Sequence, residues 1–478
     1  MSESIVTTTA GALRGSTGDG VRRFLNIPYA SPPGRFAAPA PHPGWTEIRD
    51  ATRPGPTAPQ PNRGGFAALD MSPFFGPGWV RGEEFLTANV WAPQDARHRP
   101  VMVFVHGGGF VSGSTRSPLY DGTAFARDDV VLVTLNYRLG ITGFLDVPGA
   151  PRNRGLLDVI AALRWVRDNI EAFGGDPGNV TLFGQSAGAT LVAALLAEPA
   201  ASGLFRRAIV QSGNGLGAFS PEQAAVVTRA AAYVLGVEPN LAGFDSVPDE
   251  RLVEIMPGLT GLDLQTAEEF DPLVGLTPFD VVLERQPADS DLAEVDLLVG
   301  SNAEEGNLYL APQGTLVTST ADDVRELAAR VHRNPEALIA AYRAQRPGAG
   351  DGELRSAILG DAMFTAGGRR LAEAHGNAHV YEFAWRSSAV DGQLGAAHSV
   401  ELPFVFDLLD LPVLRGPQAL LGRDEPPADL AKEMHGAWVS FATTGDPGWP
   451  RFGEQGRIRR FDAVSETTTA RDLSMWRS

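Results

Sequence analysis

Short apolar runs alternate with stretches of helical hydrophobic period along the chain from about residue 100. Apolar runs of this length are typical of buried β-strands, and the longer periodic stretches are typical of helices that cover a sheet. Because strands and helices alternate, the pattern predicts an α/β protein with a mostly parallel sheet and helices on both faces. The predicted elements are strands at 101–105, 130–135, 180–183 and 207–211, and helices at 156–173 and 187–196.

The second half of the chain continues the same alternation of strands and helices. The hydrophobic pattern does not change at any point in a way that would mark a second domain. We therefore predict a single domain over residues 1–478, with a helical insertion between the central strands and the last ones. Residues 30–65 and 72–78 are rich in proline and glycine and are predicted to form irregular surface loops. The elements predicted in the second half are helices at 221–261, 322–346 and 430–443, and strands at 295–299 and 380–385.

The pentapeptide Gly-Gln-Ser-Ala-Gly at 184–188 separates a predicted strand from a predicted helix. A serine on such a sharp turn is held exposed in a strained conformation, and the flanking glycines allow the strand and the helix to approach closely. This pattern indicates that Ser186 is a nucleophile. The alternative is an ordinary strand-to-helix turn capped by a serine, and the choice depends on whether the chain supplies a base, an acid and oxyanion donors.

A serine nucleophile needs a base, usually a histidine held by a carboxylate. Of the eight histidines, only His398 is predicted to lie in a loop after the last predicted strand, downstream of Ser186. His106 ends a predicted strand but begins a glycine run, which indicates another role. We therefore predict that His398 is the base, with a solvated loop histidine as the alternative. The remaining histidines lie before strands, within helical patterns or in the proline-rich loop: His42, His98, His332, His375, His379 and His435.

The acid that orients the histidine is expected between the serine and the histidine in the chain. Glu304 and Glu305 follow the strand predicted at 295–299, which places two carboxylates at the edge of the sheet where ligands bind in parallel folds. Neighbouring side chains point in different directions, so one of the two can reach His398. The periodicity does not choose between them.

Residues 106–110, His-Gly-Gly-Gly-Phe, follow another predicted strand. Exposed amides in such a glycine loop, together with the amide after the nucleophile, form the oxyanion hole of esterases. The alternatives are a flexible turn and a phosphate cradle, but the GxxxxGK[ST] pattern of a phosphate loop is absent. Because the loop occurs together with the serine, acid and histidine in the expected order, we predict an oxyanion hole.

The 478-residue chain has 40 Lys and Arg against 57 Asp and Glu, a net charge of −17, so nucleic acid and anionic membranes are poor partners. The absence of cysteine excludes disulfides, thiolate metal sites and a cysteine nucleophile. His375 and His379 are four apart, but no HExxH motif occurs, and no metal or organic cofactor is predicted.

No apolar run is long enough to span a membrane and no signal peptide is visible, so a soluble, cytoplasmic protein is expected.

Taken together, the motifs resemble those of the type-B carboxylesterase family, which includes cholinesterases and bacterial p-nitrobenzyl esterases. The resemblance extends over nearly the whole chain and implies the α/β-hydrolase fold. The matching segments are FLNIPYA at 24–30, EEFLTANVW at 83–91, HGGGF at 106–110, NYRLG at 136–140, NRGLLD at 153–158, NIEAFGGDP at 169–177 and FRRAIVQSG at 205–213.

The resemblance implies a catalytic triad of Ser186 as nucleophile, Glu305 as acid and His398 as base. It also implies that Ser212 lies beside the triad, and that Gln185 stands where the family usually has a glutamate, which removes a negative charge while keeping hydrogen-bonding capacity. The oxyanion hole implied by the family consists of the amides of Gly108, Gly109 and Ala187.

The predicted function is hydrolysis of small-molecule carboxylic esters through an acyl-enzyme intermediate, with no cofactor. The cysteine that usually follows the acidic residues of the 83–91 segment is absent, and no choline-binding tryptophan is identified, so choline esters are not favoured. Two alternatives remain open: hydrolysis of an amide or carbamate by the same triad, and a cholinesterase-like binding protein without catalysis. The natural substrate and the oligomeric state are not predicted.

Overall fold

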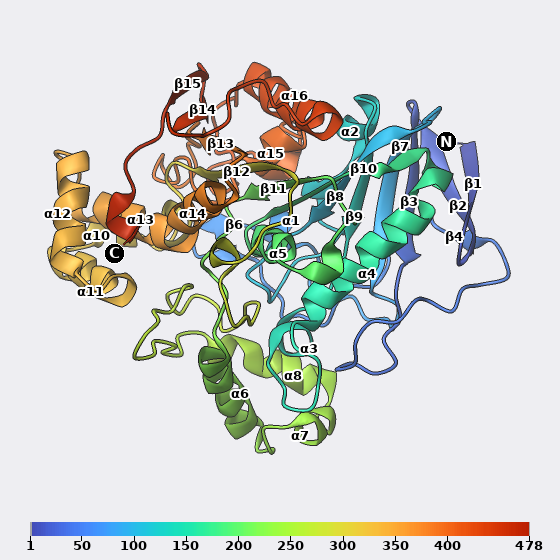
Figure 1. The fold of residues 1–478 in the computed structure, drawn as a ribbon, viewed down its shortest axis with the longest axis horizontal. Coiled ribbons are helices and arrows are strands. Elements are labelled where there is room, and N and C mark those ends of the chain that lie inside the picture. The colour runs from blue at the N-terminus through green and yellow to red at the C-terminus, as the bar shows by residue number, and fades with distance from the viewer. Residues whose placement is uncertain (1, 478) are drawn as a thin grey trace.

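A computed structural model describes residues 2–477 and places most of the strands in one large twisted sheet (Figure 1). The sheet has thirteen strands in the order β1-β2-β3-β7-β9-β8-β10-β11-β12-β13-β14-β15, with β4 beside β2. Its strands are β1 (Ser2–Thr8), β2 (Gly11–Gly18), β3 (Val21–Pro28), β4 (Arg49–Asp50), β7 (Thr87–Pro93), β8 (Arg99–Val105), β9 (Val131–Leu135), β10 (Gly175–Gln185), β11 (Arg207–Gln211), β12 (Asp296–Asn302), β13 (Ala378–Phe383), β14 (Arg457–Phe461) and β15 (Glu466–Thr469); a separate pair is formed by β5 (Gly65–Phe66) and β6 (Leu69–Asp70).

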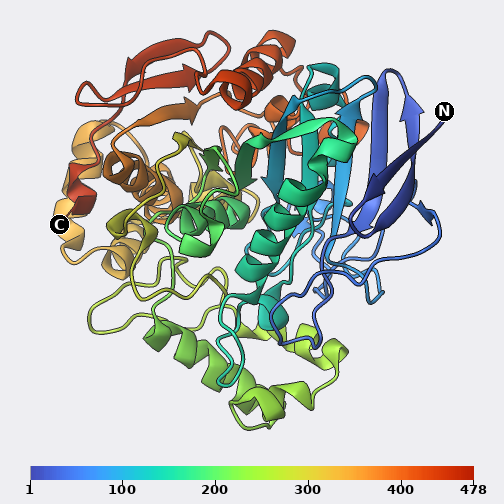
Figure 2. The ribbon, with the colours of Figure 1, turned by 45° about the vertical axis from the view of Figure 1, so that its right-hand side comes forward.

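Helices surround this sheet and form two blocks beyond it (Figures 1 and 2). The helices are α1 (Ser72–Phe75), α2 (Thr123–Arg127), α3 (Gly140–Phe144), α4 (Arg154–Asn169), α5 (Ala187–Leu196), α6 (Pro221–Leu235), α7 (Leu241–Asp245), α8 (Asp249–Ile255), α9 (Asn307–Leu310), α10 (Thr315–Thr318), α11 (Ala321–Val331), α12 (Pro335–Gln345), α13 (Asp351–Gly360), α14 (Ala366–His375), α15 (Leu402–Val405) and α16 (Ala428–Thr444).

The predicted alternation of strands and helices is confirmed in the middle of the chain. From β9 to β14 neighbouring strands are parallel. Alternate residues of β8 face opposite sides, so Val103 and Val105 pack in one hydrophobic cluster with α4 and α5, whereas Met102 and Phe104 pack in a second cluster with α2 and α16. Both faces of the sheet are therefore buried under helices, as expected for parallel strands.

The two ends of the sheet differ from the prediction. Strands β1, β2, β3 and β7 join β9 through antiparallel pairs, and β14 with β15 adds two strands after the one predicted to be last. Edge strands of an antiparallel sheet keep one face in water, so they lack the continuous apolar runs that mark the central strands. For example, β1 has only two buried residues, Val6 and Thr8.

The helical insertion is confirmed, but it is divided into two blocks. Helices α6 to α8, at the bottom of Figure 1, lie between β11 and β12, and helices α9 to α14 lie between β12 and β13. Of the proline-rich segments, 31–64 is irregular apart from β4, whereas 72–78 contains the short helix α1, which begins with Ser72 and Pro73. Proline is tolerated in the first turn of a helix because the amide that it lacks has no partner there.

Candidate active site

The turn between β10 and α5 holds Ser186 in a conformation that a non-glycine residue rarely adopts, with φ 58° and ψ −127°. The Ser186 amide donates to the carbonyl of Gln211 on the adjacent strand β11 at 2.9 Å. Such a backbone costs of order 1–3 kcal/mol and persists only where the surrounding structure holds it. The strain keeps the Ser186 side chain at the end of the parallel strands, where it retains partial exposure.

The two glycines of this turn are required by close backbone approach. A β-carbon on Gly188 would stand 2.0 Å from the carbonyl oxygen of Val105 at the end of β8. A β-carbon on Gly184 would stand 2.6 Å from the backbone of Gly188. Strand and helix therefore touch through backbone alone, which agrees with the reason given above for glycine at both positions.

His398 and Glu305 form a buried pair. A Glu305 carboxylate oxygen, Oε2, lies 2.6 Å from Nδ1 of His398, and the side chains are 1% and 4% exposed. The other oxygen accepts hydrogen bonds from the Ser212 hydroxyl at 2.6 Å and from the Asn302 amide at 2.7 Å. The carboxylate is thus fixed by three donors, and it can hold the proton of the imidazole on Nδ1.

Glu304 turns away from this pair. One of its oxygens forms an ion pair with Arg386, and the other accepts from the Ala396 amide at 2.9 Å. Of the two carboxylates that the hydrophobic period left open, Glu305, the one that the family resemblance implies, is therefore the one that contacts His398.

Ser186 and His398 line the same cavity, but within residues 2–477 no hydrogen bond joins them. Instead, Nε2 of His398 lies 3.2 Å from the side-chain amide nitrogen of Gln185, which is also 3.1 Å from the Ser399 hydroxyl. An amide N–H in this position donates to Nε2, so it favours the neutral imidazole with its proton on Nδ1. Hydrogen bonds to a catalytic base are often long or absent before substrate binds, and this arrangement leaves Nε2 as a free base once Gln185 releases it.

Three backbone amides face the same cavity. Gly108, Gly109 and Ala187 all line it, and none of their amides donates a hydrogen bond to another group in the described chain. Gly108 has φ 116°, and a β-carbon there would stand 1.9 Å from the carbonyl oxygen of Ser112, so the loop requires glycine. Unpaired backbone donors beside a reacting carbonyl can stabilise a developing oxyanion.

His106 supports this loop from within the core. Burial lowers the pKa of His106 to about 4, so its ring is neutral at pH 7. Its ring stacks on Tyr137 at 4.5 Å, and the Tyr137 hydroxyl donates to the His106 carbonyl at 2.8 Å. The structure therefore gives His106 a packing role, in agreement with the separate role expected from its place before the glycines.

Several neighbours of His398 carry no local signal in the sequence. Phe364, from the π-helical segment Asp361–Thr365, stacks on the imidazole at 4.2 Å. Glu401 is fully buried and accepts from the Asn302 side-chain amide at 2.7 Å. Burial, reinforced by the charge of Glu305, raises the pKa of Glu401 to about 7.

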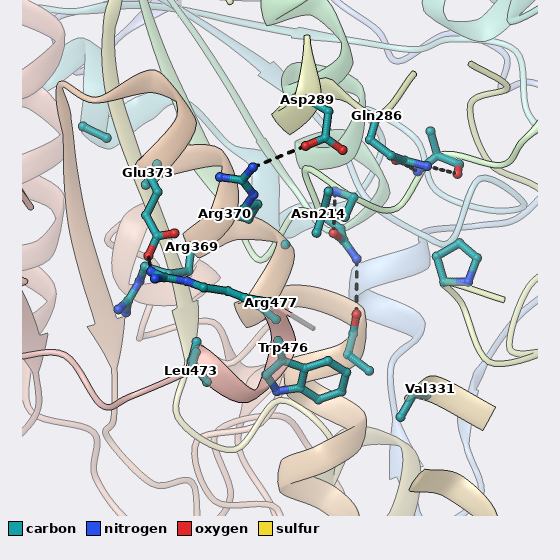
Figure 3. Close-up of a pocket in the computed structure, with 18 of the residues that line it drawn as sticks. Asn214, Gln286, Asp289, Val331, Arg369, Arg370, Glu373, Leu473, Trp476 and Arg477 are labelled. Atoms are coloured by element: carbon teal, nitrogen blue, oxygen red, sulfur yellow. Dashed lines mark hydrogen bonds and ion pairs between the residues drawn. The ribbon is translucent and has the colours of Figure 1, made fainter. Parts of the chain in front are cut away.

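The cavity with Ser186 and His398 is narrow, about 60 Å³, and mostly apolar. A larger cleft of about 1150 Å³ lies elsewhere and contains none of Ser186, Glu305 and His398. Figure 3 shows its arginines: Arg370 pairs with Asp289, and Arg477 pairs with Glu373. This larger cleft is therefore not the one that Ser186 and His398 line.

Within residues 2–477, no group of three or more His, Cys, Asp or Glu side chains is arranged to hold a metal ion. The same residues contain no helix that is both long enough and apolar enough to cross a bilayer. The expectation that the enzyme needs no metal stays a prediction.

The mostly parallel sheet, the surrounding helices and the strained serine after β10 define the class of protein: the chain has the α/β-hydrolase fold. The structure is similar to a PNB esterase, with a TM-score of 0.80 and 33% identity, over 100% of this chain and 99% of that chain. It is also similar to the Geobacillus stearothermophilus carboxylesterase EST55, with a TM-score of 0.82 and 34% identity, over 97% of each chain.

The family model described as "Carboxylesterase family" matches residues 2–469, and the chain belongs to this family. It is 37% identical to the phenmedipham hydrolase of Pseudarthrobacter oxydans, over 94% of this chain and 92% of the relative. It is 35% identical to the para-nitrobenzyl esterase of Bacillus subtilis, over 96% and 94%. The resemblance drawn from the motifs is confirmed. The protein is a carboxylesterase, which sets aside the alternative of a binding protein without catalysis.

Proposed function

We propose that this carboxylesterase cleaves small-molecule carboxylic esters with Ser186 as nucleophile, His398 as general base and Glu305 as orienting acid. The observation that carries the proposal is the contact of 2.6 Å between Glu305 and His398, beside a cavity that Ser186 also lines. A carboxylate on Nδ1 leaves Nε2 unprotonated, which is the state that a general base needs.

In the first half of the reaction, Nε2 of His398 takes the hydroxyl proton of Ser186 while the serine oxygen attacks the ester carbonyl. The negative charge moves to the carbonyl oxygen, where the amides of Gly108, Gly109 and Ala187 donate to it. The tetrahedral intermediate collapses, the carbon–oxygen bond to the alcohol breaks, and the alcohol takes the proton from His398. Glu305 stabilises the imidazolium throughout, and the acyl group stays on Ser186.

In the second half, a water molecule gives a proton to His398 and attacks the acyl-serine. The same amides hold the second oxyanion, and the imidazolium returns the proton to Ser186 as the carboxylic acid leaves. For both halves, the amide of Gln185 has to release Nε2, so Gln185 is a positioning residue for the neutral imidazole before substrate binds.

The test is Ser186→Ala, assayed with p-nitrophenyl acetate. We expect kcat to fall by roughly 10⁴- to 10⁶-fold because the remaining groups provide only binding and oxyanion stabilisation. Ser202→Ala, at an exposed serine, serves as the control and should retain wild-type turnover. Irreversible labelling of the wild type by an organophosphate, absent in Ser186→Ala, would support the same assignment. A folded Ser186→Ala protein with near-wild-type turnover would refute it.

A second candidate is hydrolysis of an amide or carbamate by the same groups. The observation in its favour is the likeness to a protein named phenmedipham hydrolase. The two functions differ mainly in how the leaving group is protonated, which His398 performs in either case. A panel of p-nitrophenyl esters, an anilide, a phenyl carbamate and phenmedipham itself, compared by kcat/KM, separates them.

We also propose that the chain forms one domain over residues 1–478, because both hydrophobic clusters pack on the same sheet. Small-molecule esters are the proposed partners, and the net charge of −17 disfavours nucleic acid. The cytoplasmic location stays a prediction.

A further inference from the structure

One arginine lines the cavity that holds Ser186 and His398. Arg63 lies in the proline- and glycine-rich loop before β5, and its side chain is partly buried. The guanidinium carbon lies 4.8 Å from the ring centre of Phe66 and 4.7 Å from that of Phe75. Both rings therefore lie against its cationic group.

Arg63 has no anionic partner. Within residues 2–477, no carboxylate lies within 4.0 Å of its nitrogens, and it donates no hydrogen bond to the protein. Burial lowers the pKa of Arg63, and the nearby Tyr309 hydroxyl only partly offsets this effect. By contrast, the buried Arg138 is paired with Asp158 at 2.7 Å. A partly desolvated cation is normally paired, so Arg63 is available to bind an anion from outside the chain.

Arg63 lies close to the loop that is proposed to bind the oxygen of the reacting carbonyl. Its Nη1 atom lies 3.8 Å from the point where a β-carbon on Gly109 would stand. Gly109 is one of the proposed oxyanion donors. Among the residues that line the cavity, those that keep some solvent exposure are Arg63, Phe66, Gly109, Ser186, Leu276 and Tyr309. The cation therefore lies beside the oxyanion loop, at a part of the cavity that retains solvent exposure.

We propose that Arg63 binds a carboxylate carried by the substrate, so that this enzyme selects esters that bear a free carboxylate in addition to the ester group. The inference rests on the proposed function, because it places the ester carbonyl at Ser186. The N–H groups of Arg63 have no partner in the described chain, and a guanidinium can bind a carboxylate through two parallel hydrogen bonds.

The net charge of the whole protein makes the positive charge of Arg63 more important for the binding of an anionic substrate. The chain carries a net charge of −17, which repels anionic substrates at long range. A neutral ester needs no cation at the mouth of the cavity, whereas an anionic ester gains from one that is partly desolvated. Salt screens the long-range repulsion as well as the contact with Arg63, so it is the contribution of Arg63, measured as wild type against Arg63→Met, that should weaken as ionic strength rises.

The test compares two pairs of esters that differ only in the charged group. On the acyl side, the pair is mono-p-nitrophenyl adipate and its methyl ester; on the alcohol side, it is 4-acetoxybenzoate and methyl 4-acetoxybenzoate. The measured quantity is the ratio of kcat/KM for the anionic ester to that for the neutral ester. The proteins are the wild type, Arg63→Met and the control Arg53→Met, which removes the same charge at an exposed position outside the cavity.

In the wild type we expect a ratio above one for at least one pair, and in Arg63→Met we expect that ratio to fall by about 10- to 100-fold, the range for a charged hydrogen bond. Arg53→Met should keep the wild-type ratio. The pair that responds identifies the side of the ester that carries the carboxylate. Added salt should reduce the difference in this ratio between the wild type and Arg63→Met.

Equal ratios in the wild type and Arg63→Met for both pairs would overturn the inference. That result is distinct from failure of the proposed function, which would appear as turnover of the neutral esters by Ser186→Ala. Because each ratio is measured on one protein preparation, partial loss of folded enzyme in Arg63→Met cancels. The ratio therefore reports the charge alone.

Discussion

The two adjacent carboxylates Glu304 and Glu305 show how much one residue changes the chemistry. Glu305 is buried and contacts His398, whereas Glu304 is partly exposed and pairs with Arg386. Two glutamates that are neighbours in the chain therefore differ in role: Glu305 is placed to orient an imidazole, and Glu304 is placed to pair with an arginine at the surface.

This difference gives a residue-scale prediction. Glu305→Gln should lower kcat for p-nitrophenyl acetate by roughly 10⁴-fold, because an amide at Nδ1 favours the wrong imidazole tautomer. Glu304→Gln removes only an exposed pair worth up to about 1 kcal/mol, so it should change kcat by less than about fivefold. Steady-state kinetics of both variants at pH 7 measures the difference. The opposite ranking would move the acid to residue 304.

At the scale of elements, the site depends on where β8, β10 and α5 meet. Gly188 on α5 lies against the carbonyl of Val105 at the end of β8, and that contact sets the distance between the nucleophile turn and the oxyanion loop. The strain at Ser186 and the unpaired amide of Ala187 both depend on this approach.

We therefore predict that Gly188→Ala separates the two elements. A new methyl group 2.0 Å from a carbonyl oxygen forces a backbone shift, and a shift of about 1 Å in a catalytic group can cost 10²-fold in rate. We expect kcat/KM to fall by at least about 100-fold and the free energy of unfolding to fall by about 1–3 kcal/mol. Gly436→Ala in α16, where the added atom meets nothing within 4 Å, is the control and should leave kcat/KM unchanged. Full activity in Gly188→Ala would mean that the turn at Ser186 tolerates a larger distance between α5 and the end of β8.

At the scale of the whole molecule, two hydrophobic clusters lie on opposite faces of one sheet, and the carboxylate of Glu401 is enclosed behind the site. Because its pKa in the folded protein, about 7, lies above its ordinary value of 4.5, the folded state binds the proton more tightly than the unfolded state. The stability from this proton is fully present below pH 4.5 and is lost as pH rises through 7.

Glu401→Gln, a neutral side chain of the same size, should remove this dependence. Relative to the wild type, the variant should gain about 2–3 kcal/mol in free energy of unfolding between pH 5 and pH 8, since one pKa unit corresponds to about 1.4 kcal/mol. Chemical denaturation at the two pH values measures the change. Glu466→Gln on the exposed strand β15 is the control. A gain in Glu401→Gln that is the same at pH 5 and pH 8 would exclude titration of Glu401 as the cause.

The central strands and helices could be predicted because their signals are local. A buried parallel strand is a continuous apolar run, and a covering helix repeats its apolar face every turn. The antiparallel edge strands β1 and β15 were missed because they are partly solvated, and pairing with a distant neighbour decides their structure. The glycine turns at Ser186 and Gly108 could be predicted for the same local reason, since their backbone geometry needs residues without a side chain.

The sequence by itself thus determined the order of the elements, the strained serine turn, the glycine loop and the loop that carries His398, because each depends on residues close together in the chain. Only the tertiary structure decided that Glu305 rather than Glu304 faces His398, that Gln185 occupies Nε2, and that Arg63 faces the cavity without a partner. Those outcomes depend on contacts between segments far apart in the chain. Hydrophobic period tells whether a side chain points toward the core, but it does not tell which side chain from another segment it meets there.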